Sequence, residues 1–100
     1  MRDFIKNSYI AEIAGIPVWH GSSVDLGVLE ASYLHTCAAT ENATLSSDIF
    51  GEFCRVDDLI VEPIKIENGY ANITEKPGLG VELDQEAIEK YKVNKSTKVN

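Results

Sequence analysis

A short apolar run at residues 16–19, Ile-Pro-Val-Trp, is the feature that most restricts the fold of this 100-residue chain. The run is too brief for a helix and is bounded by Gly21 and Ser22, so it indicates a strand. Both faces of the strand are apolar, which is typical of parallel sheets, where the partner strands come from other βα units. The sequence offers only one strand of this kind, so how the chain covers it is the main question about the fold.

Helical patterns lie on both sides of this strand. Apolar residues three and four apart predict a helix over residues 3–14, which ends at Gly15. After the strand, Ser22 and Ser23 are candidate N-caps of a second helix that continues to about residue 39. The apolar stripes of the two helices are formed by Ile5, Tyr9, Ile10 and Ile13, and by Leu26, Leu29, Tyr33, Leu34 and Cys37.

Turn and cap residues gather in residues 40–48, which therefore mark the best internal boundary. Farther on, Asn68-Gly69 separates two β-like runs and predicts a two-residue hairpin turn. Asp84 is expected to cap a last helix. The predicted organisation has three parts: residues 1–44, residues 45–93 and a disordered tail of residues 94–100.

The charge balance excludes several partners. Nine Lys and Arg against 16 Asp and Glu give a formal net charge of −7, so the chain lacks the basic footprint that binds a phosphate backbone. No apolar run approaches the roughly 20 residues of a membrane span, and the N-terminus has no apolar signal-peptide core. We therefore expect a soluble cytoplasmic protein that binds neither nucleic acid nor membrane, with Cys37 and Cys54 as buried small hydrophobic residues.

The segment of residues 19–25 carries the candidate chemistry, because it joins the end of the strand to the next helix. In α/β folds, ligands bind at this end of the strands. An imidazole, two hydroxyls, free helix amides and a carboxylate lie close together there, which is enough to orient a small anionic or polar substrate. The candidate site residues are Trp19, His20, Ser22, Ser23 and Asp25.

Two of these residues have an alternative structural role. Asp25 is the candidate acid, but a carboxylate near the first turn of a helix also stabilises the helix dipole by about 0.3–1 kcal/mol. His20 equally fits a residue at the end of a strand that bonds a backbone carbonyl. The local sequence leaves both readings open.

A metal site within the chain is not expected. His35 and Cys37 are two residues apart and point to different faces of a helix, and the His and Cys residues together lack the spacing of a zinc site. Asp57, Asp58 and Glu62 are interpreted as solvated turn charges, because octahedral oxygen sites draw ligands from several elements.

Four stretches of the sequence together resemble a known family. They are AGIPVWHG at residues 14–21, the helix of residues 27–39, DIFG at 48–51 with VDDLI at 56–60, and above all PGLGVELD at 77–84. Over residues 3 to about 93 the chain resembles the C-terminal end of the mandelate racemase and muconate lactonizing enzyme group of the enolase superfamily.

The resemblance implies an α/β fold: the C-terminal fragment of a TIM-type (β/α)7β barrel, joined to the tail of an α+β capping domain that contains the hairpin. Residues 17–20 would be the last barrel strand and residues 25–39 its helix. Residues 45–93 would complete the capping domain. A complete barrel needs about 250 residues, so the chain would be less than half of an enzyme.

The resemblance also implies a reaction. Enzymes of this group abstract the proton α to a carboxylate and stabilise the enediolate on a divalent metal, usually Mg²⁺, and then act as racemases, epimerases, cycloisomerases or dehydratases. Asp25 falls where the family has an acid, often Glu, after the last strand, and Trp19, His20, Ser22 and Ser23 would line the pocket for a small carboxylate. The family's metal carboxylates and catalytic bases lie on other strands, so this chain alone would hold no metal and would be inactive. A homo-oligomer remains open for the full-length enzyme.

The competing hypothesis is a non-catalytic module that folds alone. In that case a helix-strand-helix unit packs on the hairpin, and the acidic surface binds a basic partner.

Overall fold

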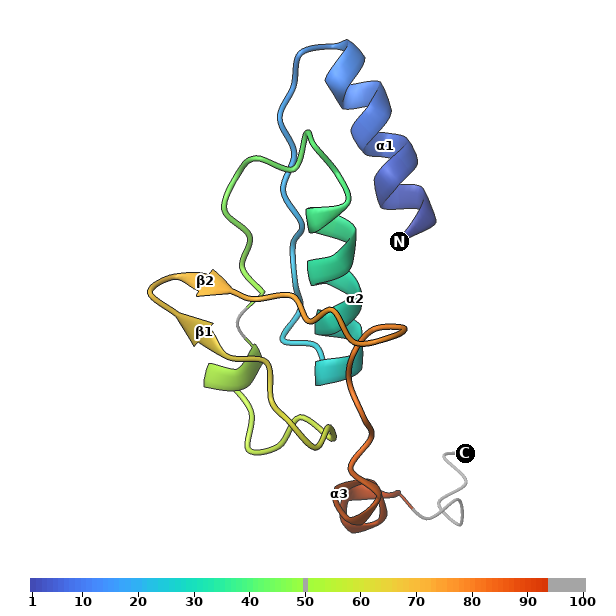
Figure 1. Ribbon diagram of the computed structural model, residues 1–100, viewed down its shortest axis with the longest axis vertical. Coiled ribbons are helices and arrows are strands. Elements are labelled where there is room, and N and C mark those ends of the chain that lie inside the picture. The colour runs from blue at the N-terminus through green and yellow to red at the C-terminus, as the bar shows by residue number, and fades with distance from the viewer. Residues whose placement is uncertain (50, 94–100) are drawn as a thin grey trace, which may run out of the picture.

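The computed structural model describes residues 1–49 and 51–93. Its helices are α1 (Arg2–Ile13), α2 (Gly27–Ala38) and α3 (Gln85–Tyr91), with a single 3₁₀ turn, η1 (Gly51–Phe53), after α2. Strands β1 (Ile66–Glu67) and β2 (Tyr70–Ala71) form a two-stranded antiparallel sheet. Figure 1 shows α1 and α3 at opposite ends of the molecule, with α2 and the hairpin between them.

Helix α1 forms and ends as the sequence predicts. Gly15 adopts a φ of 68°, which favours glycine, directly after the C-cap residue. The N–H of Gly15 donates to the Glu12 carbonyl at 2.9 Å, and the N–H of Ile16 donates to the Ala11 carbonyl at 2.8 Å. These two bonds form a Schellman motif, which satisfies the last carbonyls of the helix and turns the chain into the extended segment.

Two extended segments, residues 16–20 and 42–48, lie side by side. The N–H of Val18 donates to the Asn42 carbonyl at 3.0 Å, and the N–H of Leu45 donates to the Val18 carbonyl at 3.4 Å. Because both segments advance in the same direction, the pairing is parallel, with α2 as the connection between them. Figure 1 shows the segment after α1 (blue) and the segment after α2 (green) descending beside each other.

The sequence did not predict this second extended segment, and the assignment of residues 17–20 as the last barrel strand stays a prediction. The second segment, residues 42–48, follows α2 and pairs with residues 16–20. The sequence predicted a turn here, because the Asn, Thr and Ser residues of positions 40–48 are typical of turns rather than of strands. The predicted division after residue 44 stays a prediction, and this pairing crosses it.

The start of α2 also differs from the prediction. Ser22 and Ser23 do not cap the helix, which begins after Leu26 without a side-chain cap. Instead, the N–H of Gly27 donates to the carbonyl of Asp58 at 3.2 Å. A side chain at Gly27 would come within 2.5 Å of the Ile60 side chain, so the C-terminal half of the chain packs directly on the first turn of α2.

The C-terminal elements agree with the predictions. Asn68 and Gly69 both have positive φ, 53° and 80°, as a type I′ hairpin turn requires. The Asp84 carboxylate accepts the N–H groups of Glu86 and Ala87, both at 3.0 Å, and so caps α3. The predicted disordered tail of residues 94–100 lies outside the described residues.

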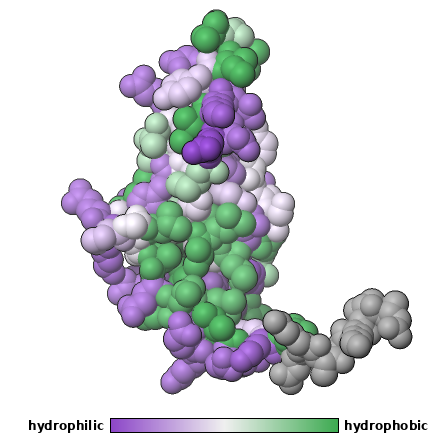
Figure 2. All heavy atoms as spheres, turned by 90° about the vertical axis from the view of Figure 1, so that its right-hand side faces the viewer, coloured by the Kyte–Doolittle hydropathy of each residue, from purple (hydrophilic) through white to green (hydrophobic). Residues whose placement is uncertain are grey.

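The buried apolar core of the described residues is small. It consists of Ala31, Ile49, Ile60 and Ala87. Large apolar side chains remain exposed on α1 and α2, among them Ile13, which is 90% exposed. Figure 2 shows an extended hydrophobic area on the side of the molecule that carries these helices. The structure is thus a small α/β arrangement whose helices leave apolar faces uncovered.

Two further expectations concern single features. Cys37 and Cys54 are free thiols, and Cys54 is exposed, so the expectation that both are buried is wrong for Cys54. In the described part of the chain, every helix is too short or too polar to cross a bilayer.

Candidate functional site

The loop of residues 21–26 carries the predicted acid at the end of the first extended segment. Asp25 is half-buried, and its Oδ2 accepts the N–H of Ser23 at 2.9 Å. Between them, Val24 has a φ of 62°, a conformation that a β-branched residue rarely adopts and that costs on the order of 1–3 kcal/mol. The loop is therefore held in one conformation by its surroundings.

The two serines of the loop bond backbone and carboxylate groups. The N–H of Ser22 donates to Asp48 Oδ1 at 2.7 Å, which ties the loop to the second extended segment. The hydroxyl oxygen of Ser22 accepts the N–H of Val24 at 3.2 Å. Asp48 was not predicted as a site residue, although a carboxylate at the end of a segment parallel to residues 16–20 is a signal for one.

Trp19 and His20 are neighbours on the extended segment but differ in their surroundings. The His20 ring stacks between Phe4 of α1, at 4.6 Å between centroids, and Tyr33 of α2, at 4.1 Å. Its Nδ1 lies 2.8 Å from the Gly21 carbonyl, which agrees with the reading of His20 as a strand-end residue bonded to the backbone. Trp19 is 48% exposed.

Tyr33 joins the loop from α2 and was missed as a site residue. Burial, together with the negative charge of Asp25, raises the pKa of its phenol. The sequence placed Tyr33 in the apolar stripe of the helix.

A second polar cluster lies on the other side of α2. Arg55 donates from Nη2 to Glu30 Oε2 at 3.1 Å and from Nε to Asp58 Oδ1 at 2.7 Å. Burial alone lowers the pKa of the guanidinium, but the bonds to Asp58 and Glu30 raise it above its usual value. Asp58 is 7% exposed, so its interpretation as a solvated turn charge is wrong.

This cluster holds η1 against α2. Glu30 Oε1 accepts the N–H of Gly51 at 2.7 Å. A Cβ at Gly51 would lie 2.1 Å from both Arg55 Nη1 and Glu30 Oε1, so the cluster needs a glycine there. Because every charge of the cluster is engaged within the chain, its role is structural.

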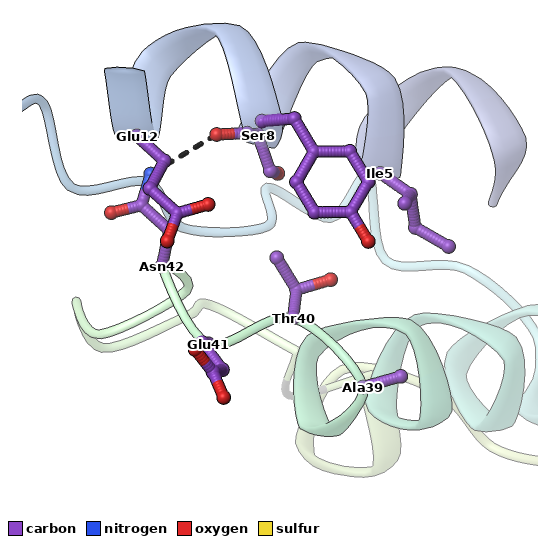
Figure 3. Close-up of a pocket in the computed structure, with 8 residues that line it drawn as sticks. Ile5, Ser8, Glu12, Ala39, Thr40, Glu41 and Asn42 are labelled. Atoms are coloured by element: carbon purple, nitrogen blue, oxygen red, sulfur yellow. Dashed lines mark hydrogen bonds between the residues drawn. The ribbon is translucent and has the colours of Figure 1, made fainter. Parts of the chain in front are cut away.

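A cavity lies elsewhere, between α1 and the end of α2. It measures about 250 Å³, and Ser8, Glu12, Thr40 and Asn42 contribute its polar groups. Figure 3 shows the Asn42 amide reaching the Ser8 carbonyl, a bond of 3.3 Å. Asn42 also bonds the carbonyl of Ile16, so the cavity lies at the start of the extended segment, away from Asp25. In barrel folds this end contributes stability, whereas the other end carries chemistry.

The residues present do not fit a metal site on their own. Within the described residues, no three His, Cys, Asp or Glu side chains converge on a point where they could hold an ion. The arrangement instead provides a positioned carboxylate, two hydroxyl-bearing residues and an exposed indole at one end of a parallel pair of segments.

Comparison with known proteins identifies relatives of this arrangement. Residues 1–87 match the family model described as enolase C-terminal domain-like. Muconate cycloisomerase 1 of Rhodococcus opacus is 31% identical over 85 residues, which are 85% of this chain and 23% of the relative. The o-succinylbenzoate synthase of Bacillus subtilis is 35% identical over 75 residues, 74% of this chain and 20% of the relative. D-xylonate dehydratase of Haloferax volcanii is 33% identical over 98 residues, 97% of this chain and 23% of the relative.

A solved structure supports the same relationship. The muconate lactonizing enzyme from Klebsiella pneumoniae superimposes with a TM-score of 0.80 at 28% identity, over 87% of this chain and 24% of that enzyme. The chain thus spans about a fifth to a quarter of the length of the relatives it matches.

Proposed function

Since the chain belongs to the enolase C-terminal domain-like family, we propose that it forms the C-terminal portion of an enolase-superfamily isomerase or lyase. The reaction is abstraction of the proton α to a carboxylate, followed by racemisation, epimerisation, cycloisomerisation or dehydration. The relatives include cycloisomerases, a synthase and a dehydratase, which supports the superfamily without selecting one reaction. The observation that carries the proposal is the Asp25 carboxylate, held by the Ser23 amide at the end of a parallel segment.

Asp25 is the group of this chain that acts on the reacting atoms. An enediolate has two negatively charged oxygens and is stabilised by hydrogen-bond donors and cations. In its protonated form Asp25 donates a hydrogen bond or a proton to the enediolate, on the side that faces this loop. Asp is shorter than the Glu that the family often carries, so the substrate lies closer to the loop backbone.

The neighbouring residues bind and orient the substrate. Trp19 offers an exposed apolar surface beside the loop, and Ser22 and Ser23 offer hydroxyl groups. The His20 ring is stacked between Phe4 of α1 and Tyr33 of α2. It therefore shapes the pocket but does not reach into it. The substrate class is a small carboxylate.

The family is typically Mg²⁺-dependent, and a divalent cation supplies the charge that stabilises an enediolate. The described residues of this chain do not fit such a site. We therefore assign the metal ligands and the catalytic base to parts of the enzyme outside these 100 residues. On its own, the chain is expected to be inactive.

A graft into a full-length relative tests the role of Asp25. The matching part of the Rhodococcus opacus enzyme is replaced by this chain, and its cycloisomerase turnover is measured with Asp25 and with Asp25→Asn. Loss of an acid at the reacting atoms lowers kcat by about 10²- to 10⁴-fold, with little change in thermal stability.

Asp84→Asn is the matched control, because it makes the same change of charge at a helix cap where Asn serves as well as Asp. This graft should keep the turnover of the unmutated graft. Equal turnover of the Asp25→Asn graft and the control would reject the proposed role.

A further inference from the structure

The second extended segment holds the first one through side chains as well as through the backbone. Near residue 18 the two segments bond through backbone carbonyls. Farther along, side chains of the second segment take the place of the carbonyls. Ser47 Oγ accepts the N–H of His20 at 3.3 Å, and Asp48 Oδ1 accepts the N–H of Ser22 at 2.7 Å. The last of these bonds is made to a carboxylate, and such bonds are roughly twice as strong as those to neutral acceptors.

Asp48 lies on a well-anchored part of the chain. The next residue, Ile49, belongs to the buried apolar core, and Gly51 donates its N–H to Glu30 of α2 at 2.7 Å. Before Asp48, the N–H of Leu45 donates to the backbone of the first segment. The carboxylate is therefore presented from a backbone that is held on both sides.

The loop that receives this bond is strained. Val24 has a φ of 62°, which a β-branched residue rarely adopts. Two further bonds lie within the loop: Ser22 Oγ accepts the N–H of Val24 at 3.2 Å, and Asp25 Oδ2 accepts the N–H of Ser23 at 2.9 Å. Because these bonds join residues two positions apart, a shift of Ser22 is passed on to Asp25.

We propose that Asp48 is a positioning residue, which holds the loop through the N–H of Ser22 and thereby fixes the Asp25 carboxylate where it meets the substrate. This inference rests on the proposed role of Asp25 as the acid of the reaction. It adds a residue outside the loop that acts through the backbone and need not touch the substrate. Without the bond, the loop is free to relax the φ of Val24, and the carboxylate of Asp25 moves with it.

The effect on the loop is tested in the 100-residue chain by amide hydrogen exchange, followed by NMR. The reporter is the N–H of Ser23, which donates to the Asp25 carboxylate. Asp48→Ala removes the acceptor of the Ser22 N–H and should speed exchange at Ser23 by about tenfold or more. Asp48→Asn keeps a carbonyl oxygen as acceptor and should change the rate by less than about threefold.

Asp84→Ala is the matched control. It removes another carboxylate that accepts backbone N–H groups, but at the start of α3. Exchange at Ser23 should be the same in this variant as in the unmutated chain.

The effect on catalysis is tested in the grafted enzyme. Asp48→Ala should lower kcat by about 10²-fold, because a misplacement of a catalytic group by roughly 1 Å costs this much. Asp48→Asn should restore most of kcat, since it keeps the acceptor. Asp84→Ala should retain the kcat of the unmutated graft and shows how the loss of a stabilising carboxylate alone affects turnover.

An unchanged exchange rate at Ser23 in the Asp48→Ala chain overturns the inference. So does a kcat of the Asp48→Ala graft that matches that of Asp84→Ala, when Asp25→Asn does lower kcat. Equal losses of kcat in Asp48→Ala and Asp48→Asn would also contradict it, because Asp48 would then act through its charge or proton. Failure of the proposed function has a different signature: exchange at Ser23 still responds to Asp48→Ala, while Asp25→Asn leaves the turnover of the grafted enzyme intact.

Discussion

The two sides of α2 reverse the usual pattern of a surface helix. Toward the C-terminal half of the chain, α2 presents Glu30, which is only 2% exposed and is bonded to Arg55 and to the backbone of Gly51. Toward solvent it presents Val28 and Leu29, which are 37% and 43% exposed. A helix of a complete globular protein buries its apolar face and exposes its polar one.

The two sides of α2 differ in whether their side chains find partners within the chain. The carboxylates of the polar side are satisfied within the chain, because each has a guanidinium or an amide partner. The apolar side lines an open groove with Leu26 and Leu79 beside Asp25. Contiguous exposed apolar patches mark surfaces that contact another polypeptide, a membrane or a ligand. Under the proposed function, the remainder of the enzyme would lie against this side of α2.

The largest expected effect comes from breaking the polar side. Arg55→Met keeps much of the side-chain volume but leaves Glu30 and Asp58 buried without their cation, so we expect a loss of about 3–5 kcal/mol in the free energy of unfolding. Urea unfolding of the chain, followed by circular dichroism, measures it.

Lys76→Met is the matched control. It removes an ion pair of similar length, 3.0 Å to Glu62, but these side chains are 62% and 79% exposed. Such a pair contributes about 0–1 kcal/mol. If Arg55→Met and Lys76→Met destabilise the chain equally, the buried cluster does not hold α2 to the C-terminal half.

A smaller effect is expected on the apolar side. Leu29→Gln retains helix propensity and changes a side chain that is 43% exposed, so the unfolding free energy of this chain should change by no more than about 0.5 kcal/mol. In the grafted enzyme the same change would bury an unpaired amide and cost about 1–3 kcal/mol.

The effect of Leu29→Gln on stability is measured by urea unfolding of the chain and by thermal inactivation of the grafted enzyme. The two results are then compared. An equally small effect in both would show that nothing covers this side of α2 in the enzyme.

The smallest effect concerns Cys37, which lies near the end of α2 and is half-buried. Burial raises the pKa of its thiol above the ordinary 9.0, while bonds to Ser47 and the His20 backbone oppose this. A raised pKa means that the folded chain holds the thiol proton more tightly than the unfolded chain. The associated stability is present below the ordinary pKa and is lost as the pH rises through the raised value.

Cys37→Ser should therefore reduce the loss of stability between pH 8 and pH 10, measured by urea unfolding at each pH, since Ser does not titrate there. Cys54→Ser, at an exposed position, is the control. A pH profile that is the same with and without Cys37 would rule out this contribution.

Local signals were sufficient to predict most of the helices and turns. Gly15 ends α1, Asn68-Gly69 forms the hairpin, and Asp84 caps α3, because each of these features depends on the conformational preference or bonding of one or two residues. The candidate loop followed from the same kind of reasoning, since it lies between an apolar extended segment and a helix.

Features that depend on distant contacts were not predictable. The extended segment of residues 42–48 is defined by its bonds to residues 16–22, and its polar composition resembles a turn. The burial of Asp58 depends on Arg55 and on the first turn of α2, and the pKa of Tyr33 depends on the charge of Asp25. Helical periodicity assigns a residue to a face, but it does not tell which groups lie opposite that face.

The division of the site between this chain and the rest of the enzyme is tested most directly by titration calorimetry with Mg²⁺ at neutral pH. The account predicts stoichiometric binding by the grafted full-length enzyme and none by the 100-residue chain, because the chain supplies Asp25 and the rest of the enzyme supplies the metal ligands. Tight, stoichiometric binding of Mg²⁺ by the 100-residue chain alone would contradict it.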